Sequence, residues 1–344
     1  MTDGVGEPSG SAAEGYVVRS PTDLLGRIFS RREAGVLFGF LVLYGLIAVT
    51  RPDIFFDWDR MSGVTFRLFR TAAVYVIIGI GMSYLIIGGE FDLSVGSMFA
   101  VGGLSFGLLM QSYELTALAA LAVVLLIAAG VGVTNGVIVT KIGVPSLIAT
   151  IGMLSVLRGV ALYISPGGGR SVPRDDPVVG VFGGTTEVFG VGITHQVFWA
   201  LGLVLLLGFV LQKTKFGYHV YAVGDDPEAA EMTGVNADRV KLLNFVLIAV
   251  LAALAGVVSI SYFGSMFGTS GMGYELLIIA AVVIGGTNLF GGEGTLIGMV
   301  LGALVIAIIP QLLVLNGFAV EIQEFLTGVV IIVAVVLDIL FRGR

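Results

Sequence analysis

The chain has 344 residues, a hydrophobic fraction of 56%, a charged fraction of 12% and a mean hydropathy of +1.01. Soluble domains carry about 25% charged residues, so this composition excludes an ordinary soluble domain and indicates a membrane protein. The net charge of −6 offers no basic surface for nucleic acid, and the absence of cysteine excludes disulfides and thiolate metal sites. The two histidines, His195 and His219, are distant in the sequence, so we expect neither a metal site nor another cofactor.

The first segment, residues 1–33, is polar and lacks the apolar stretch of a signal peptide. We expect a cytoplasmic tail there, a transmembrane domain over residues 34–340, and a short cytoplasmic C-terminus at 341–344. A spanning helix needs about 20 apolar residues. Candidate runs lie at 34–50, 71–89, 93–113, 115–140, 142–157, 188–212, 242–274, 276–292, 294–320 and 325–337. The sequence therefore predicts an all-α polytopic membrane protein with about ten transmembrane helices and both termini in the cytoplasm.

Because successive spans cross the membrane in opposite directions, the connecting segments are expected to alternate between the two sides, starting from a cytoplasmic N-terminus. Residues 51–70 and 166–187 are expected outside, and the glycines and prolines of 166–187 exclude regular structure over most of its length. The run 242–274 is too long for one span, and we expect an outer loop near Ser265–Gly273. Residues 213–241 are expected inside.

This inner segment, residues 213–241, contains a short helix with both ends marked. Asp226 can cap the first turn, Pro227 suits the first helical position, and Gly234 can close the helix in a left-handed conformation. The basic residues that flank it favour the cytoplasmic side: Lys213, Lys215, Arg239 and Lys241. The helix is too short to be stable alone, so it predicts a docking surface for a soluble partner. The alternative is a polar loop that only connects two spans.

Two glycine-rich polar breaks interrupt the apolar runs, GGEFDLSVGS at 88–97 and GGTNLFGGEG at 285–294. A carboxylate at membrane depth costs about 2.5–3.5 kcal/mol, so acids here are not expected to face lipid. The candidates for a polar path or gate are Glu90, Asp92, Ser94, Asn135 and Asn288, with Thr150, Asn244 and Ser261 as further candidates. The structural alternative is that Asp92 or Ser94 caps the next span and that the amides satisfy backbone groups.

The chain has no recognisable catalytic group of residues, and it contains no Gly-Lys pair, which excludes a phosphate-binding P-loop. If ATP drives a process here, another subunit binds it.

Four stretches together resemble one family. They are DLSVGS at 92–97, NGVIVTKIGVPSLIATIGMLSVLRGVAL at 135–162, KTKFGYHVYAVGDDPEAAEMTGVN at 213–236 and YELLIIAAVVIGGTNLFGGEGTLIGMVLGAL at 274–304. The chain resembles the permease subunits of ribose/xylose-type ABC sugar importers from about Asp53 to Leu340. The resemblance implies a vitamin B12-importer-like (type II) permease fold in the plasma membrane of a prokaryote. It also implies partners: ATP-binding subunits, an extracellular or periplasmic sugar-binding protein, and a second permease subunit.

The resemblance further assigns an ATPase-coupling role to one part of the inner segment. The residues that match are Gly224, Asp225, Asp226, Glu228, Ala229, Ala230, Glu231 and Gly234. Two positions depart from the usual family pattern, because Glu90 extends the first break and Glu293 replaces a basic residue in the second. Glycine-rich faces near 285–302 are candidates for contact with the second permease subunit.

Other functions remain open at this stage. Relatives in the same superfamily carry branched-chain amino acids or nucleosides, although they usually lack the DLSVGS string. A secondary transporter or channel acting alone would explain the glycine-rich breaks but not the capped helix.

Overall fold

The computed structural model describes residues 31–188 and 191–319, together with residues 321, 322, 325, 326, 328, 329, 332 and 336. The long elements are α2 (Arg31–Thr50), α4 (Trp58–Ile87), α5 (Val95–Ser112), α6 (Ala117–Val137), α7 (Ser146–Tyr163), α9 (His195–Lys213), α12 (Ala237–Phe263) and α14 (Leu296–Leu315). The short helices are α3 (Pro52–Phe55), η1 (Ile138–Ile142), α8 (Pro177–Gly183), α10 (Lys215–Asp225), α11 (Pro227–Met232) and α13 (Tyr274–Ile284). The strands are β1 (Arg170–Ser171), β2 (Thr185–Val188), β3 (Val191–Thr194) and β4 (Ser265–Met266).

Eight helices in the described part are long and apolar enough to cross a membrane, and α13 is a shorter apolar helix. The all-α polytopic prediction is therefore confirmed. Nine of the ten predicted runs correspond to these nine helices, and the tenth, 325–337, lies largely outside the described residues. The same holds for most of the predicted tail at 1–33 and for the C-terminus at 341–344.

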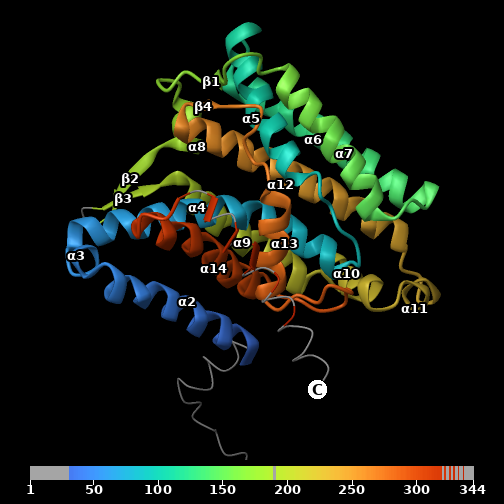
Figure 1. The fold of residues 1–344 in the computed structure, drawn as a ribbon. Helices are drawn as coiled ribbons and strands as arrows, with labels where there is room; N and C mark the ends of the chain where they lie inside the picture. Colours follow the sequence, from blue (N-terminus) through green and yellow to red (C-terminus); the bar gives the residue numbers. More distant parts are fainter. Residues whose placement is uncertain are drawn as a thin grey trace, which may run out of the picture.

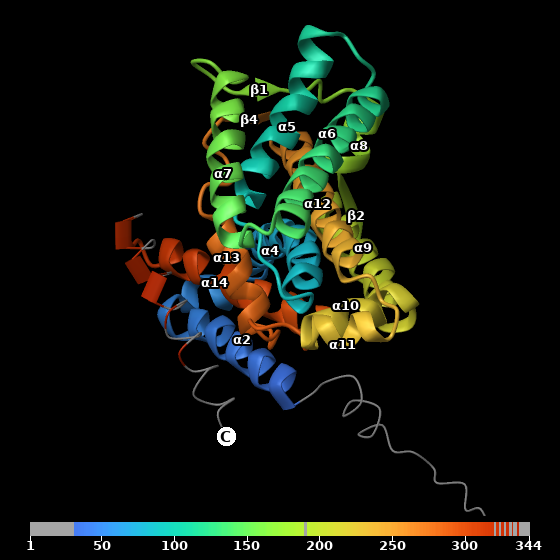
Figure 2. The same cartoon turned by 90° about the vertical axis from the view of Figure 1, so that its right-hand side faces the viewer.

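The mostly buried helices are α4, α5, α12 and α14, whereas less than a third of the apolar stretch of α2, α6, α7 and α9 is buried. Helix α12 packs against α4 and α5 at the centre, and α6 covers α12 from outside. In Figure 2, α10 and α11 lie at the bottom and β1 at the top. We call these two extremes the α11 end and the β1 end. Figure 1 shows the same separation, with α11 at the lower right and the strand pairs at the upper left.

The segment 51–70 differs from its predicted form as an outer loop, because α4 begins within it at Trp58. Asp57 caps this helix by accepting a hydrogen bond from the backbone N–H of Arg60 at 3.1 Å. No glycine pair or proline interrupts the chain between Trp58 and Ile87, so the helix continues through the charged positions. At 30 residues, α4 is about 45 Å long and exceeds the thickness of a hydrocarbon core.

The segment 166–187 is also more regular than predicted. It contains β1, most of β2 and the seven-residue helix α8. Asp176 caps α8 by accepting from the N–H of Val178 and Val179, and Pro177 occupies the first helical position. Strand β1 pairs with β4, and β2 pairs with β3, both antiparallel. The pair of β1 and β4 lies at the β1 end, as Figure 2 shows.

Candidate coupling surface and translocation path

Helix α11 forms at the predicted place with the predicted caps. Asp226 accepts hydrogen bonds from the N–H groups of Glu228 and Ala229, each at 3.0 Å. At the other end, Gly234 adopts φ +87° and donates to the carbonyl of Glu231, while Val235 donates to the carbonyl of Ala230. This pair of bonds is a Schellman closure. The short helix is therefore fixed by its own termini rather than by extensive packing.

Most of the candidate coupling residues are exposed on this helix. Asp225, Asp226, Glu228, Ala229, Glu231 and Gly234 are exposed, and so is Met232, at 88%. Ala230 and Gly224 are buried, because they face the protein's own core. Ala230 therefore anchors α11 to the chain, and the surface available to a partner consists of acidic residues around Ala229 and Met232.

Gly224 brings α10 against both glycine-rich breaks. A β-carbon at Gly224 would clash with the carbonyl oxygen of Ile87, the last residue of α4, and would lie 2.7 Å from the N–H nitrogen of Gly292. Gly292 in turn donates to the carbonyl of Ile87 at 2.9 Å. We call this contact of Gly224, Ile87 and Gly292 the glycine junction. The three separate sequence signals thus meet at one point near the α11 end.

The non-helical part of the first break, residues 88–94, consists of turns and irregular backbone, and we call it the first joint. Asp92 is buried, and its Oδ1 accepts from the N–H and the hydroxyl of Ser94 at 2.7 and 2.6 Å. Asn135 of α6 donates from Nδ2 to Asp92 Oδ2 at 3.2 Å and to Ser94 Oγ at 3.3 Å. Three of the predicted path residues therefore form one buried network at the start of α5.

Side chains of α7 satisfy the backbone of the same joint. The N–H of Leu93 donates to Thr150 Oγ1 at 3.1 Å, and the N–H of Phe91 donates to Ser146 Oγ at 3.3 Å. The hydroxyl of Thr150, a further path candidate, is therefore engaged by the chain itself. This arrangement fits the alternative that these polar side chains satisfy backbone groups of the joint rather than line a path.

Glu90 and Lys241 form an ion pair of 2.7 Å, with side chains only 13% and 20% exposed. Lys241 lies in the first turns of α12, directly after α11, so the pair ties the first joint to the coupling segment. A second pair, Lys141 with Asp238 at 2.8 Å, also reaches α12 but is much more exposed. Glu90 was a candidate gate residue, and the structure places it in this electrostatic link.

The second break forms a loop over residues 285–295 that packs on α10. Tyr221 donates its hydroxyl to the carbonyl of Gly294 at 2.7 Å. Asn288 is half-buried, and its side-chain oxygen accepts from the N–H of Phe290 at 3.1 Å, which stabilises the loop itself. Of the predicted path residues, Asn288 is not joined to the network of Asp92.

The glycines considered for subunit contact are used inside the chain. β-carbons on Gly285 and Gly298 would each clash with the other residue's backbone, and one on Gly302 would clash with the carbonyl of Ala281. They allow α13 and α14 to pack closely, so they do not form an exposed face.

The last two path candidates lie outside the network of Asp92. Asn244 is buried and donates to the carbonyl of Tyr84 at 3.0 Å, which completes the last turn of α4. Ser261 is buried at the β1 end, where its backbone lies against Gly183 of α8. Asn244 lies at the edge of the first joint, since its Nδ2 would be 2.8 Å from a β-carbon on Gly88, whereas Ser261 is remote from it.

The loop predicted near Ser265–Gly273 forms as a second non-helical stretch, residues 264–273, which we call the second joint. Helix α12 stops at Phe263, next to the predicted start of this loop. The chain then pairs with β1 and continues along α5, so that a β-carbon on Gly96 would clash with the carbonyl of Gly271. Three glycines of the stretch adopt positive φ: Gly264, Gly271 and Gly273. The sequence did not predict these contacts with α5.

Polar groups inside the membrane part accompany the second joint. Arg158 of α7 donates from Nη1 to the carbonyls of Gly268 and Ser270, at 2.7 and 2.9 Å. Glu275, in the first turn of α13, has a buried Oε2 that accepts no hydrogen bond from the described residues. This oxygen would meet a β-carbon on Gly96 at 2.5 Å. The first turns of α5 and α13 therefore meet, with a carboxylate between them.

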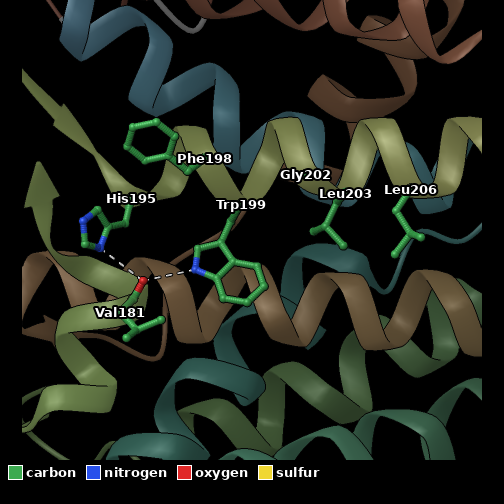
Figure 3. Close-up of a pocket in the computed structure, with 7 residues that line it drawn as sticks. All are labelled: Val181, His195, Phe198, Trp199, Gly202, Leu203 and Leu206. Carbon is green, nitrogen blue, oxygen red and sulfur yellow. Dashed lines mark hydrogen bonds between the residues drawn. The ribbon is translucent and has the colours of Figure 1, made fainter. Parts of the chain in front are cut away.

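A groove with a volume of about 500 Å³ lies between α8 and α9, shown in Figure 3. It is lined mainly by apolar side chains: Val181, Phe198, Trp199, Leu203 and Leu206. Its histidine, His195, lies 2.8 Å from the carbonyl of Gly180 through Nδ1 and 2.8 Å from Thr186 Oγ1 through Nε2. A carbonyl can only accept, so Nδ1 carries the proton and Nε2 accepts from the threonine. The groove is therefore part of the apolar exterior of α9 and brings no reactive group to the joints.

The fold and these contacts define a multi-pass membrane protein whose interrupted crossings connect directly to a capped surface helix. A family described as "Branched-chain amino acid transport system / permease component" matches residues 64–335. The chain belongs to this family of transport permeases.

Several relatives match nearly the whole chain. The ribose import permease protein RbsC of Escherichia coli is 34% identical over 314 residues, which cover 89% of this chain and 93% of the relative. The probable ABC transporter permease protein YphD of Escherichia coli is 36% identical over 313 residues, or 91% of each chain. The autoinducer 2 import system permease protein LsrC of Yersinia enterocolitica is 31% identical over 316 residues, covering 90% and 83%. No solved structure gives a significant match. The resemblance to sugar importer permeases is thereby confirmed.

Proposed function

We propose that this chain is the membrane subunit of an ATP-driven importer that moves a neutral monosaccharide of the ribose, xylose or glucose type into the cytoplasm. The relatives named for ribose import support the substrate class. ATP is hydrolysed by partner subunits, because the chain has no P-loop of its own. A binding protein delivers the sugar at the β1 end, and the α11 end faces the cytoplasm with both termini.

The glycine junction is the observation that carries the proposal. An ATPase subunit grips α11 in a groove and contacts Glu228, Glu231 and Met232. Because α10 touches Ile87 and Gly292 through Gly224, a displacement of α11 reaches both glycine-rich breaks without an intermediate element. The network of Asp92, Ser94 and Asn135, together with the ion pair of Glu90, then acts as the cytoplasmic gate of the path.

The working unit is a dimer of two permease subunits with two ATPase subunits, in a type II, vitamin B12-importer-like arrangement. A closed two-fold pair places the path along the symmetry axis and offers one α11 to each ATPase subunit. Asn288 stabilises the loop that rests on α10 rather than lining the path.

The test uses the permease reconstituted in liposomes with an ATPase subunit and a sugar-binding protein from the same organism. We expect ribose-dependent uptake and ATP hydrolysis. Leucine-dependent uptake in place of ribose uptake would favour a branched-chain amino acid importer, and uptake without any ATPase would favour a secondary transporter.

The Gly234→Val variant tests the coupling role. A valine in the left-handed conformation costs about 1–2 kcal/mol, which loosens the C-terminal closure of α11. Gly143→Val is the matched control, because Gly143 also has a positive φ and no neighbour within 4 Å of a β-carbon, but lies outside α11. We expect Gly234→Val to retain folding and lose most ribose uptake, while Gly143→Val retains uptake. Equal uptake by both variants would contradict the coupling role.

A further inference from the structure

The second joint lies at membrane depth. Near β1, Gly107 of α5 lies against the backbone of Ser171, and β1 pairs with β4 at Met266. Five residues later, Gly271 lies against Gly96, at the start of α5. Gly96 and Gly107 are three helical turns apart, or about 16 Å, which is roughly half of a hydrocarbon core. Helix α13, with 11 residues, covers a similar distance and completes the crossing.

Burial alternates along the first half of this joint. Gly264, Met266 and Gly268 are buried, whereas Ser265, Phe267 and Thr269 are exposed. Ser265 and Met266 form strand β4 and residues 268–273 form turns, so the alternation marks one covered and one exposed side of this stretch. The covered face packs on α5 and α7, where a β-carbon on Gly268 would lie 3.0 Å from Leu162. The opposite face has no cover within the described part of the chain.

Lipid cannot cover an irregular backbone in the hydrocarbon region, because lipid offers no hydrogen bonds. Such a backbone is found only where protein buries it or where it lines a water-filled cavity. Arg158 satisfies two carbonyls from the covered side, which fixes the joint against α7 and directs its other face outward. The exposed face must therefore meet water or another protein surface.

The chemistry of this face fits a polyhydroxyl ligand. It offers two hydroxyl groups, on Ser265 and Thr269, on either side of the aromatic ring of Phe267, which is 56% exposed. No charged residue occurs between Phe263 and Tyr274. A neutral permeant needs hydrogen-bonding groups and weak, uncharged contacts so that it can leave again.

We propose that Ser265, Phe267 and Thr269 form a wall of the aqueous path and contact the sugar directly. The ring of Phe267 covers a C–H face of the sugar, and the two hydroxyls exchange hydrogen bonds with its hydroxyl groups. Arg158 is a positioning residue that holds this wall at its depth. The substrate contact rests on the proposed sugar import, whereas the aqueous character of the wall does not.

Single cysteines can test the wall, because the natural chain has none. Thr269→Cys is compared with Met266→Cys on the covered face and with Leu205→Cys on α9, which is 74% exposed on an apolar helix surface. The assembled complex in liposomes is treated with a membrane-impermeant thiol reagent. We expect the thiol of Thr269→Cys to react with the reagent. The reaction should be several-fold slower when ribose-loaded binding protein is present. The two control variants should stay unmodified.

Two outcomes would overturn the wall. They are an unreactive Thr269→Cys in a complex that still hydrolyses ATP, and an oxidative cross-link at this position between two permease copies. Reaction that ribose does not slow, in a complex that imports ribose, would reject the sugar contact. Failure of the wild-type complex to import ribose would instead reject the proposed function, while the labelling still decides whether the face is aqueous.

Uptake kinetics give an independent measure of the sugar contact. An aromatic contact of about 0.5–1.5 kcal/mol corresponds to a two- to ten-fold change in affinity. Phe267→Ala should therefore raise the KM for ribose-loaded binding protein about two- to ten-fold at unchanged maximal ATP hydrolysis, and Phe267→Tyr should restore it. An unchanged KM in Phe267→Ala would contradict the contact.

Discussion

The two joints of the membrane part make the same break in different ways. Both replace helix by turns and irregular backbone, and both lead into helices whose first turns meet at Gly96. The first joint is enclosed, since side chains of α6 and α7 satisfy its polar groups. The second joint is held from one side only, by Arg158, and its other face is open.

This difference separates two roles within one bundle. The first joint is enclosed and most of its polar groups are hydrogen-bonded, although Oδ1 of Asn135 accepts no hydrogen bond from the described residues. An enclosed polar network is rigid, so the first joint can transmit a displacement but offers no free surface to a ligand. An open face with hydroxyl and aromatic groups can meet a ligand but has few contacts through which force could pass. The first joint also touches the coupling segment through Gly224, which the second joint does not.

The largest expected effect is at the glycine junction. Gly224→Ala places a methyl group on the carbonyl of Ile87, and neither backbone can give way as a flexible side chain would. Overpacking of this kind costs about 1–3 kcal/mol and sometimes more. We expect a clear fall in the unfolding temperature of the purified permease and loss of ribose-stimulated ATP hydrolysis.

The control for this variant is Gly130→Ala. Gly130 lies within α6 and has no neighbour within 4 Å of a β-carbon. Alanine is the better helix former by about 1 kcal/mol, so this change should be neutral or stabilising. If Gly224→Ala were as stable and active as Gly130→Ala, the glycine junction would not be a close contact.

The two capped short helices show how far the sequence could predict the fold. Asp226 and Pro227 begin α11, and the same pair of residue types, Asp176 and Pro177, begins α8. The first pair led to a correct prediction, because Gly234 marked the other end of the helix. The second pair was overlooked, since the glycines and prolines around it favoured an irregular loop. A short capped helix can be predicted from sequence when residues typical of helix termini occur at both of its ends.

The residues of the candidate site could be predicted only in part, because some of its contacts join segments far apart in the sequence. The glycine-rich breaks were visible because polar residues interrupt apolar runs, and Asp92, Ser94 and Asn135 do meet. The second joint was predicted as an outer loop because the run 242–274 is too long for one span. Its contacts with Gly96 and Arg158 come from segments far away in the sequence, so no local pattern records them.

The next largest effect is expected at the second joint. Arg158→Leu leaves the carbonyls of Gly268 and Ser270 without their donor, at a cost of about 1–3 kcal/mol for a buried unsatisfied group. We expect a lower unfolding temperature, with Arg158→Lys between this variant and the wild type. Arg67→Leu is the control, because Arg67 is exposed on α4 and such changes are usually within about 0.5 kcal/mol. Equal unfolding temperatures for the two leucine variants would show that the joint is held by other contacts.

The smallest effect concerns the ion pair that ties the first joint to α12. Glu90 and Lys241 are 13% and 20% exposed, whereas Lys141 and Asp238 are 62% and 41% exposed at nearly the same separation. Exposed pairs contribute about 0.2–1 kcal/mol, and water screens the exposed pair more strongly. Double-mutant cycles with Glu90→Gln and Lys241→Met, and with Lys141→Met and Asp238→Asn, give the coupling energy of each pair from the free energy of unfolding.

We expect the coupling energy of the Glu90–Lys241 pair to be the larger by a few tenths of a kcal/mol. We also expect Glu90→Gln to lower ribose-stimulated ATP hydrolysis about two-fold. Asp238→Asn should leave that activity unchanged, because its pair does not reach the joint. A larger coupling energy for the exposed pair would contradict a role of the Glu90–Lys241 pair in coupling. An equal loss of activity in Glu90→Gln and Asp238→Asn would contradict it as well.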